Sequence, residues 1–256
     1  MKRPLIHRMH LFLGLGFFIA VVFSTCKTSE YAQKGDQFVL STVTHGEAYK
    51  FELEFTKGPA HNYPLMAVWI EDIQGNFIQT LYVPLSVAKG KFAHATIRER
   101  QWTSGPLRRP ATLPYWAHRQ NTVAGNEDPF PSIKNPIPDA YTGATPKGDF
   151  TLKSALETKI KDPFRVWFEI NQFFDFNEFW TNNRYPDDKD YKTSGQPSLI
   201  YASDLIFPNT LPVTVPLHLM GHGHYSGLNG HIYSSLHTIT SAKKIVKSIK
   251  VTVSKE

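Results

Sequence analysis

The stretch Tyr49-Lys-Phe-Glu-Leu-Glu-Phe-Thr56 (YKFELEFT) decides the fold class. Aromatic and aliphatic residues occupy every second position, and lysine and glutamate occupy the positions between them. Successive side chains of a β-strand point to opposite faces of the sheet, so this alternation predicts a strand with one buried face and one solvent-exposed face. We expect this strand to cover residues 47–56.

The same β pattern recurs along the rest of the chain. Residues 65–73 and 77–83 flank Gln74-Gly75-Asn76, where Gly75 permits a positive φ, and this arrangement predicts a hairpin. Further strands are expected at residues 149–155, 164–170, 198–205, 211–219 and 245–253. Many short strands without a long helix predict an all-β protein, an antiparallel β-sandwich that is immunoglobulin-like or related.

Residues 90–138 lack apolar periodicity and combine arginines, aromatic residues and prolines. We expect a long irregular middle loop here, inside a single sandwich domain that spans residues 36–256 and has an irregular insertion at about 90–148. The aromatic content favours burial of this loop over disorder. A short helix is expected around residues 115–122.

The N-terminus has the composition of a targeting segment. The first eight residues carry basic and no acidic side chains, and an uncharged apolar run of 13 residues, Leu11 to Phe23, follows them. This run is too short to span a bilayer comfortably and predicts a secretory signal peptide over residues 1–25. Next comes Cys26, the one cysteine of the chain.

The position of Cys26 resembles that of the acylated cysteine of bacterial lipoproteins. The resemblance implies a lipid on Cys26 that anchors the protein to a membrane, and a polar tether over residues 26–35. It also implies a location in the cell envelope, as a periplasmic or outer-membrane lipoprotein. The alternative is a secreted soluble protein.

Charge and cysteine content exclude several functions. The formal net charge is +6, and loss of residues 1–25 would leave 25 basic against 22 acidic residues, a net charge of +3. Because these charges are scattered, no nucleic-acid partner is expected. Once Cys26 is acylated, no thiol remains for a disulfide, a thiolate metal site or a cysteine nucleophile.

The segment Asp139-Ala-Tyr-Thr-Gly-Ala-Thr145 (DAYTGAT) lies between Pro138 and Pro146. Each proline biases the preceding residue toward extended conformations, so Thr145 is expected in β or polyproline geometry. Gly143 permits a tight reversal that delivers the chain into the next strand. This structural interpretation needs no cofactor.

The same residues also resemble a recognition sequence for covalent modification. A bacterial flavin transferase joins FMN, through its phosphate, to the final threonine of a similar sequence in extracytoplasmic electron carriers. The matching positions here are Asp139, Thr142, Gly143, Ala144 and Thr145. The resemblance implies Thr145 as the FMN acceptor and a flavin transferase as a partner. The chemistry requires an exposed hydroxyl on an adaptable loop with small neighbours.

A longer part of the chain, about residues 65–170, resembles an uncharacterised family of predicted periplasmic β proteins. The resemblance rests on the segments PLMAVWIEDIQGNFIQTLYV, LPYWAHR, DAYTGATPKGDFTL and FRVWFEIN. It implies an envelope location. Because that family is discussed alongside flavin transferases, it also favours covalent FMN.

A bound FMN phosphodiester would keep one negative charge and would need an aromatic or apolar shelf for its ring. The candidate cations are Lys147, Arg108 and Arg109. The candidate aromatic residues are Trp102, Tyr115, Trp116 and Tyr141. Packing in the core or in the loop is the alternative role of each aromatic residue, and we favour it for the tryptophans.

Residues 218–237 contain five of the 11 histidines of the chain. On a continued strand, His218, Met220, His222 and His224 would share one face. His222 and His224 could then chelate a metal, with His231 as a third ligand across a glycine-rich turn. No Asp or Glu occurs between Leu205 and Ser254 to act as a ligand or as an acceptor for the imidazoles. We therefore favour a hydrogen-bonded His-rich loop over a metal site.

The chain has neither the spacing of a nucleophile elbow nor that of a phosphate-binding loop, so we assign no catalytic residues and expect no catalytic activity. The leading hypothesis is a lipid-anchored extracytoplasmic β protein that carries FMN on Thr145 as an electron relay. The alternative is a cell-envelope binding module whose aromatic middle loop and His-rich end recognise a glycan, a peptide or a metal. The sequence leaves the oligomeric state open.

Overall fold

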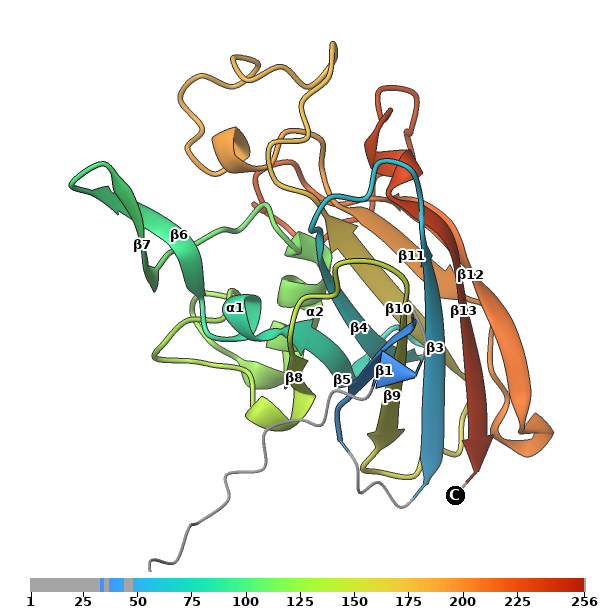
Figure 1. The fold of residues 1–256 in the computed structure, drawn as a ribbon. Coiled ribbons are helices and arrows are strands. Elements are labelled where there is room, and N and C mark those ends of the chain that lie inside the picture. The colour runs from blue at the N-terminus through green and yellow to red at the C-terminus, as the bar shows by residue number, and fades with distance from the viewer. Residues whose placement is uncertain (1–32, 35–36, 44–47, 256) are drawn as a thin grey trace, which may run out of the picture.

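The computed structural model describes residues 33–34, 37–43 and 48–255, and strands dominate it (Figure 1). Strands make up 42% and helices 13% of the structure, so the predicted all-β class is confirmed in outline. The expected signal peptide and Cys26 lie outside the described residues. Among the residues that are described, no helix is long and apolar enough to cross a membrane.

Most of the strands belong to one large sheet. Neighbouring strands pair antiparallel, except that β2 pairs parallel with β9 and β5 pairs parallel with β8. From edge to edge the order is β1 (Gln33–Lys34), β2 (Gln37–Ser41), β9 (Phe150–Leu156), β3 (Tyr49–Lys57), β13 (Val246–Lys255), β12 (Val213–His222), β11 (Leu199–Ser203), β10 (Phe164–Asn171), β4 (Leu65–Asp72), β5 (Phe77–Pro84) and β8 (Thr142–Gly143).

The large sheet curls until its two ends meet through side chains. Gln79 of β5 donates from Nε2 to the carbonyl oxygen of Ala155 at 2.9 Å, and its Oε1 accepts from the backbone nitrogen of Glu157 at 3.1 Å. Thr42 Oγ1 donates to the carbonyl oxygen of Leu81 at 2.6 Å. The sheet is thus nearly closed and barrel-like.

The predicted sandwich of two stacked sheets is not confirmed, because one continuous hydrogen-bonded sheet contains every described strand except β6 and β7. The physical reason for the difference is that alternation reports which face of a strand is buried. It does not report whether the sheet faces a second sheet or curls onto itself, since inward and outward residues alternate in both cases.

Apolar side chains fill the interior of the curled sheet. Phe55 of β3 packs against Phe150 of β9 with ring centroids 4.9 Å apart, and against Phe168 of β10 at 5.9 Å. Three strands separate β3 from β10 in the sheet order, so the contact between Phe55 and Phe168 crosses the interior. Such close packing across the sheet is typical of small closed sheets whose interior has no channel.

A second apolar cluster covers the outer face of β4. Residues on both faces of β4 are buried. Trp69 of β4 belongs to this second cluster together with Trp116, which comes from the elements that follow β5. These elements are α1 (Leu85–Ala88) and α2 (Pro114–Ala124). Helix α2 begins at Pro114, which suits the first turn, and ends at Gly125 in the left-handed region with φ 65. The short helix predicted around residues 115–122 is confirmed.

The middle of the chain is more ordered than the sequence indicated. Besides α2 it contains a two-stranded hairpin of β6 (Lys91–Arg98) and β7 (Gln101–Pro106), which projects from the left of the molecule in Figure 1. Likewise, Gln33–Lys34, inside the expected tether, pair with residues of β2. The short 3-10 helices are η1 (Asp139–Tyr141), η2 (Tyr191–Thr193), η3 (Pro208–Thr210) and η4 (Ala242–Lys244).

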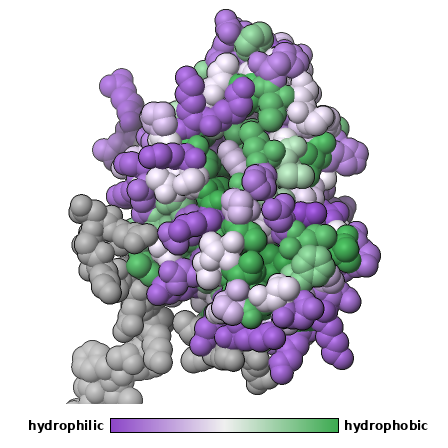
Figure 2. Space-filling model, turned by 90° about the vertical axis from the view of Figure 1, so that its right-hand side faces the viewer, coloured by the Kyte–Doolittle hydropathy of each residue, from purple (hydrophilic) through white to green (hydrophobic). Residues whose placement is uncertain are grey.

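The side of the molecule at the right of Figure 1 has a mixed surface. Figure 2 shows hydrophobic groups there between hydrophilic side chains. The exposed apolar residues of the C-terminal half include Phe207, which is 46% exposed, and Met220 of β12, which is 45% exposed. Scattered exposed apolar residues are normal on a protein surface. We therefore infer no partner for this side.

Candidate functional site

The segment from Asp139 to Gly143 is held in place by its neighbours. Asp139 to Tyr141 form η1, the carboxylate of Asp139 pairs with Lys89 at 3.1 Å, and Thr142 Oγ1 donates to the carbonyl oxygen of Asp139 at 3.0 Å. Thr142 and Gly143 then form β8 beside β5. The segment thus runs from a short helix into an edge strand of the large sheet.

Gly143 does not make the reversal that we expected from the sequence, because it lies in β8. The structure gives another reason for glycine at this position. A Cβ atom here would lie 3.1 Å from Cε2 of Tyr82 and 3.5 Å from Cδ2 of Leu40. The close approach of β8 to the neighbouring side chains, and not a special φ, favours a residue without a side chain.

Thr145 lines a cavity at the end of β2, β3 and β9. The cavity has a volume of about 700 Å³ and is lined by Phe38, Lys57, Ala144, Thr145, Lys147, Gly148 and Asp149. Thr145 is half-buried, and its hydroxyl forms no hydrogen bond with any residue that the structure describes. Tyr82 fixes the backbone just before Thr145, since its hydroxyl donates to the carbonyl oxygen of Ala144 at 2.8 Å. Thr145 is thus displayed on a fixed segment.

Cations outnumber anions among the residues that line this cavity. Lys57 and Lys147 are exposed. Among the described lining residues the one carboxylate is Asp149, which accepts a hydrogen bond from the backbone nitrogen of Lys57 at 2.8 Å. Nζ of Lys147 lies 5.7 Å from the ring centre of Tyr63. Burial lowers the pKa of the nearby His61. The charge balance favours a ligand with a negative group.

Most of the supporting residues that the sequence suggested lie elsewhere. Trp116 is fully buried, and Tyr115 packs against Trp69 and Trp167 in the second apolar cluster. Trp102 is exposed on the β6–β7 hairpin, and Tyr141 donates to Glu157. Among the described residues, none of these four aromatic side chains lines the cavity of Thr145. The packing role that we favoured for the tryptophans fits Trp116.

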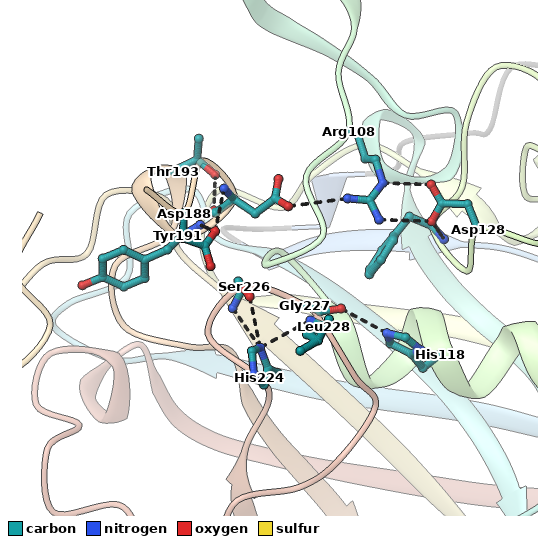
Figure 3. A network of polar contacts seen from close by, with 12 residues as sticks. Arg108, His118, Asp128, Asp188, Tyr191, Thr193, His224, Ser226, Gly227 and Leu228 are labelled. Carbon is teal, nitrogen blue, oxygen red and sulfur yellow. Dashed lines mark hydrogen bonds and ion pairs between the residues drawn. The ribbon is translucent and has the colours of Figure 1, made fainter. Parts of the chain in front are cut away.

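The two candidate arginines also have other partners. Arg108 binds Asp128 at 2.8 Å, as Figure 3 shows. It also approaches Asp190 at 3.5 Å. Arg109 lies between the rings of Phe92 and Phe173, at 4.8 Å and 4.3 Å. Of the three proposed cations, only Lys147 lines the cavity.

Phe38 and Lys57 were missed at the sequence level. They reach the cavity because β2 pairs parallel with β9 and β3 pairs antiparallel with β9. These pairings join parts of the chain that are about a hundred residues apart, so no local pattern could have indicated them.

The His-rich end does not have the alternation that we expected. The register between β11 and β12 shifts so that Ile200 pairs with Gly221 but Tyr201 pairs with Leu219, which leaves Met220 as an extra residue. Such a bulge reverses the faces that follow it. As a result His222 is buried and stacks on Tyr233, whereas His218 is exposed and lies 3.9 Å from Asp204. The prediction that His218 and His222 share one face of the strand is therefore wrong.

Hydrogen bonds determine which ring nitrogen carries the proton in two histidines, of which Figure 3 shows His224. Nδ1 of His224 accepts from the backbone nitrogens of Ser226 at 3.2 Å and Leu228 at 3.3 Å, so its neutral ring carries the proton on Nε2. Nδ1 of His222 lies 2.7 Å from the carbonyl oxygen of Gly223 and must donate to it. Burial lowers the pKa of both rings. His224 thus has no free lone pair for a metal in its neutral form.

The third proposed ligand, His231, is exposed. In the part of the chain that the structure describes, no group of three His, Cys, Asp or Glu residues is arranged to hold a metal ion. Hydrogen bonds to nearby backbone groups hold His222 and His224 in this part of the chain. Its aromatic neighbours are packed on one another, as in the pair Tyr185 and Tyr225, whose ring centres lie 4.0 Å apart.

A buried carboxylate that the sequence did not indicate lies on β10. Glu169 is fully buried, and its oxygens accept from the backbone nitrogens of Tyr115 and Trp116, at 3.2 Å and 2.7 Å, and from Ser198 Oγ at 2.5 Å. Burial raises the pKa of Glu169 to about 7, and these hydrogen bonds limit the rise. Glu169 thus connects β10 to the first turn of α2, where a carboxylate satisfies free backbone N–H groups.

Comparison with models of known protein families, with curated proteins and with solved structures found no match to this chain. The functional argument therefore depends on the residues around Thr145.

Proposed function

We propose that the protein is a lipid-anchored component of the cell envelope that carries FMN covalently on Thr145 and relays electrons. The observation that carries the proposal is the hydroxyl of Thr145, which is half-buried, has no hydrogen-bond partner among the described residues and lines a cavity of about 700 Å³. This volume is within the range of cofactor sites. The anchor in this proposal is a lipid on Cys26, and the partner is a flavin transferase.

The residues around Thr145 fit a flavin phosphodiester. The single negative charge that such an ester keeps would be offset by Lys147 and Lys57, both of which line the cavity. Phe38 supplies an aromatic side chain in the same lining, and Tyr63 lies beside Lys147. These residues provide the cation and the flat apolar contact that an isoalloxazine ring and its phosphate require.

The attachment step is a phosphoryl transfer to the hydroxyl of Thr145. The oxygen forms a new bond to the phosphorus of an FMN unit that is activated as a phosphoric anhydride. The bond from phosphorus to the leaving nucleotide breaks with its electron pair, and the hydroxyl proton passes to a base of the transferase. The bound flavin then supplies the redox chemistry. In this account the chain itself positions the hydroxyl and shields one side of the ring.

The proposal is tested by producing the protein together with a flavin transferase and recording its visible absorption. The parent is expected to be yellow with one flavin per chain, and Thr145→Ala is expected to be colourless. Thr214→Ala, which changes an exposed threonine of β12, is the control and should keep the flavin. A colourless parent would contradict the flavin proposal and leave the envelope binding module as the better description.

A further inference from the structure

The β6–β7 hairpin is an arm that stands apart from the large sheet. The name covers residues 91–106, which pair only with each other in a separate two-stranded sheet and project from the molecule in Figure 1. At its tip Arg98 pairs with Gln101 around a turn in which Glu99 and Arg100 have positive φ values of 50 and 64. An isolated two-stranded hairpin is marginally stable in water. A surface that the arm can bind would therefore stabilise it.

One face of the arm is apolar and exposed. Ile97 and Trp102 are a cross-strand pair and are 61% and 57% exposed. His94 touches the ring of Trp102 edge-on, with ring centres 5.7 Å apart. A tryptophan exposed to this extent near the tip of a projecting element suits the boundary between water and lipid, where an aromatic ring with one polar atom is favoured.

The arm is also cationic. It carries Lys91, Arg98 and Arg100 against one acid, Glu99, which gives a net charge of +2. None of these three cations forms an ion pair with another residue in the described chain, unlike Arg108 at the foot of the arm. Their charge is complementary to an anionic surface, and opposes the approach of a second copy of the same arm.

The geometry points to the arm as a docking element for an anionic phospholipid surface, with Ile97 and Trp102 entering the headgroup region and Arg98 and Arg100 binding phosphates. A stable protein interface needs roughly 800 Å² from each partner. Two exposed apolar side chains fall well short of that, whereas a lipid surface requires no shape complementarity. This contact is separate from the proposed lipid on Cys26 and does not depend on FMN.

The test places a fluorescent label at the tip of the arm in the full chain. Cys26→Ala removes the native thiol, and Gln101→Cys then carries an environment-sensitive dye. With vesicles of phosphatidylglycerol, we expect a blue shift and a brighter emission, and with phosphatidylcholine vesicles no change. Adding Arg98→Gln and Arg100→Gln is expected to weaken the apparent affinity for the anionic vesicles roughly 30-fold, since each cation near such a surface contributes about a fivefold change.

Two controls separate the arm from the rest of the chain. The first control carries the same dye on Lys247→Cys, an exposed position of β13. This variant has the same N-terminal apolar run as the test protein, but its dye should not respond to vesicles. Trp102→Ala should reduce the blue shift at position 101 while far-ultraviolet circular dichroism stays unchanged. An unchanged dye at position 101 with anionic vesicles would overturn the proposal, as would an equal response to both lipids. A response without vesicles that grows with protein concentration would assign the arm to a second copy and also overturn it.

Discussion

Thr145 lies close to two lysines that come from different parts of the chain. Lys147 follows it by two residues, whereas Lys57 ends β3 and reaches the same cavity through the pairing of β3 with β9. If FMN is bound at Thr145, these cations should favour its reduced form, because reduction adds negative charge to the ring. Both lysines are exposed, so solvent will screen much of the effect.

The expected result for Lys147→Gln is a lower midpoint potential of the attached flavin, by on the order of 10–20 mV, with unchanged flavin content. Lys57→Gln should act in the same direction. Spectroelectrochemical titration measures both. Lys153→Gln is the control, since Lys153 faces Glu52 at 3.8 Å on the outside of the sheet. Identical potentials in all of these variants would refute the role of the two lysines while leaving flavin attachment intact.

At the scale of elements, Glu169 connects β10 to the N-terminus of α2. Its pKa in the folded protein is raised from 4.5 to about 7 by burial. A folded pKa above the unfolded one means that the folded state holds the proton more tightly. The contribution of Glu169 to stability is therefore full below about pH 4.5 and falls as the pH rises to about 7, by about 3 kcal/mol in total.

Glu169→Gln should remove this pH dependence. Urea unfolding of the parent and of Glu169→Gln between pH 4.5 and pH 8 measures it, and the difference in free energy of unfolding should change by about 3 kcal/mol over this range in favour of the variant at high pH. Taking the difference cancels the opposite contribution of His222 and His224, whose pKa values are lowered. Glu54→Gln, which changes an exposed partner of Lys250, is the control. A constant difference across the range would contradict the raised pKa.

At the scale of the whole molecule, the sheet depends on side chains to close. Gln79 bridges β5 to β9 with two hydrogen bonds and is buried. Gln79→Leu would leave the carbonyl oxygen of Ala155 and the backbone nitrogen of Glu157 without these partners, so we expect a loss of about 1–3 kcal/mol in the free energy of unfolding. Thermal and urea denaturation measure it, with the exposed Gln74→Leu as control. An unchanged stability would mean that the two ends of the sheet are not joined through Gln79.

The sequence predicted elements better than it predicted their arrangement. The strands at residues 47–56, 65–73, 77–83 and 164–170 correspond to β3, β4, β5 and β10 within a few residues. Alternation and turn residues are local, and for that reason they are readable along the chain. The curl of the sheet depends on contacts such as that between Gln79 and Ala155, which no local pattern encodes.

The candidate site was predictable in part for the same reason. DAYTGAT and Lys147 are contiguous and could be recognised, whereas Phe38 and Lys57 join the site only through the folded sheet. The His-rich end shows the opposite case, because one extra residue, Met220, reversed the face of His222. A β-bulge has no reliable signature in a single sequence.

The most direct test of the central claim is the mass of the peptide that contains residue 145 after purified protein has reacted with a flavin transferase and its flavin donor. The parent and Thr145→Ser should each gain the mass of one FMN on that peptide, because both residues present a hydroxyl, and Thr145→Ala should gain nothing. An unmodified parent peptide, or an FMN adduct that persists in Thr145→Ala, would contradict the account.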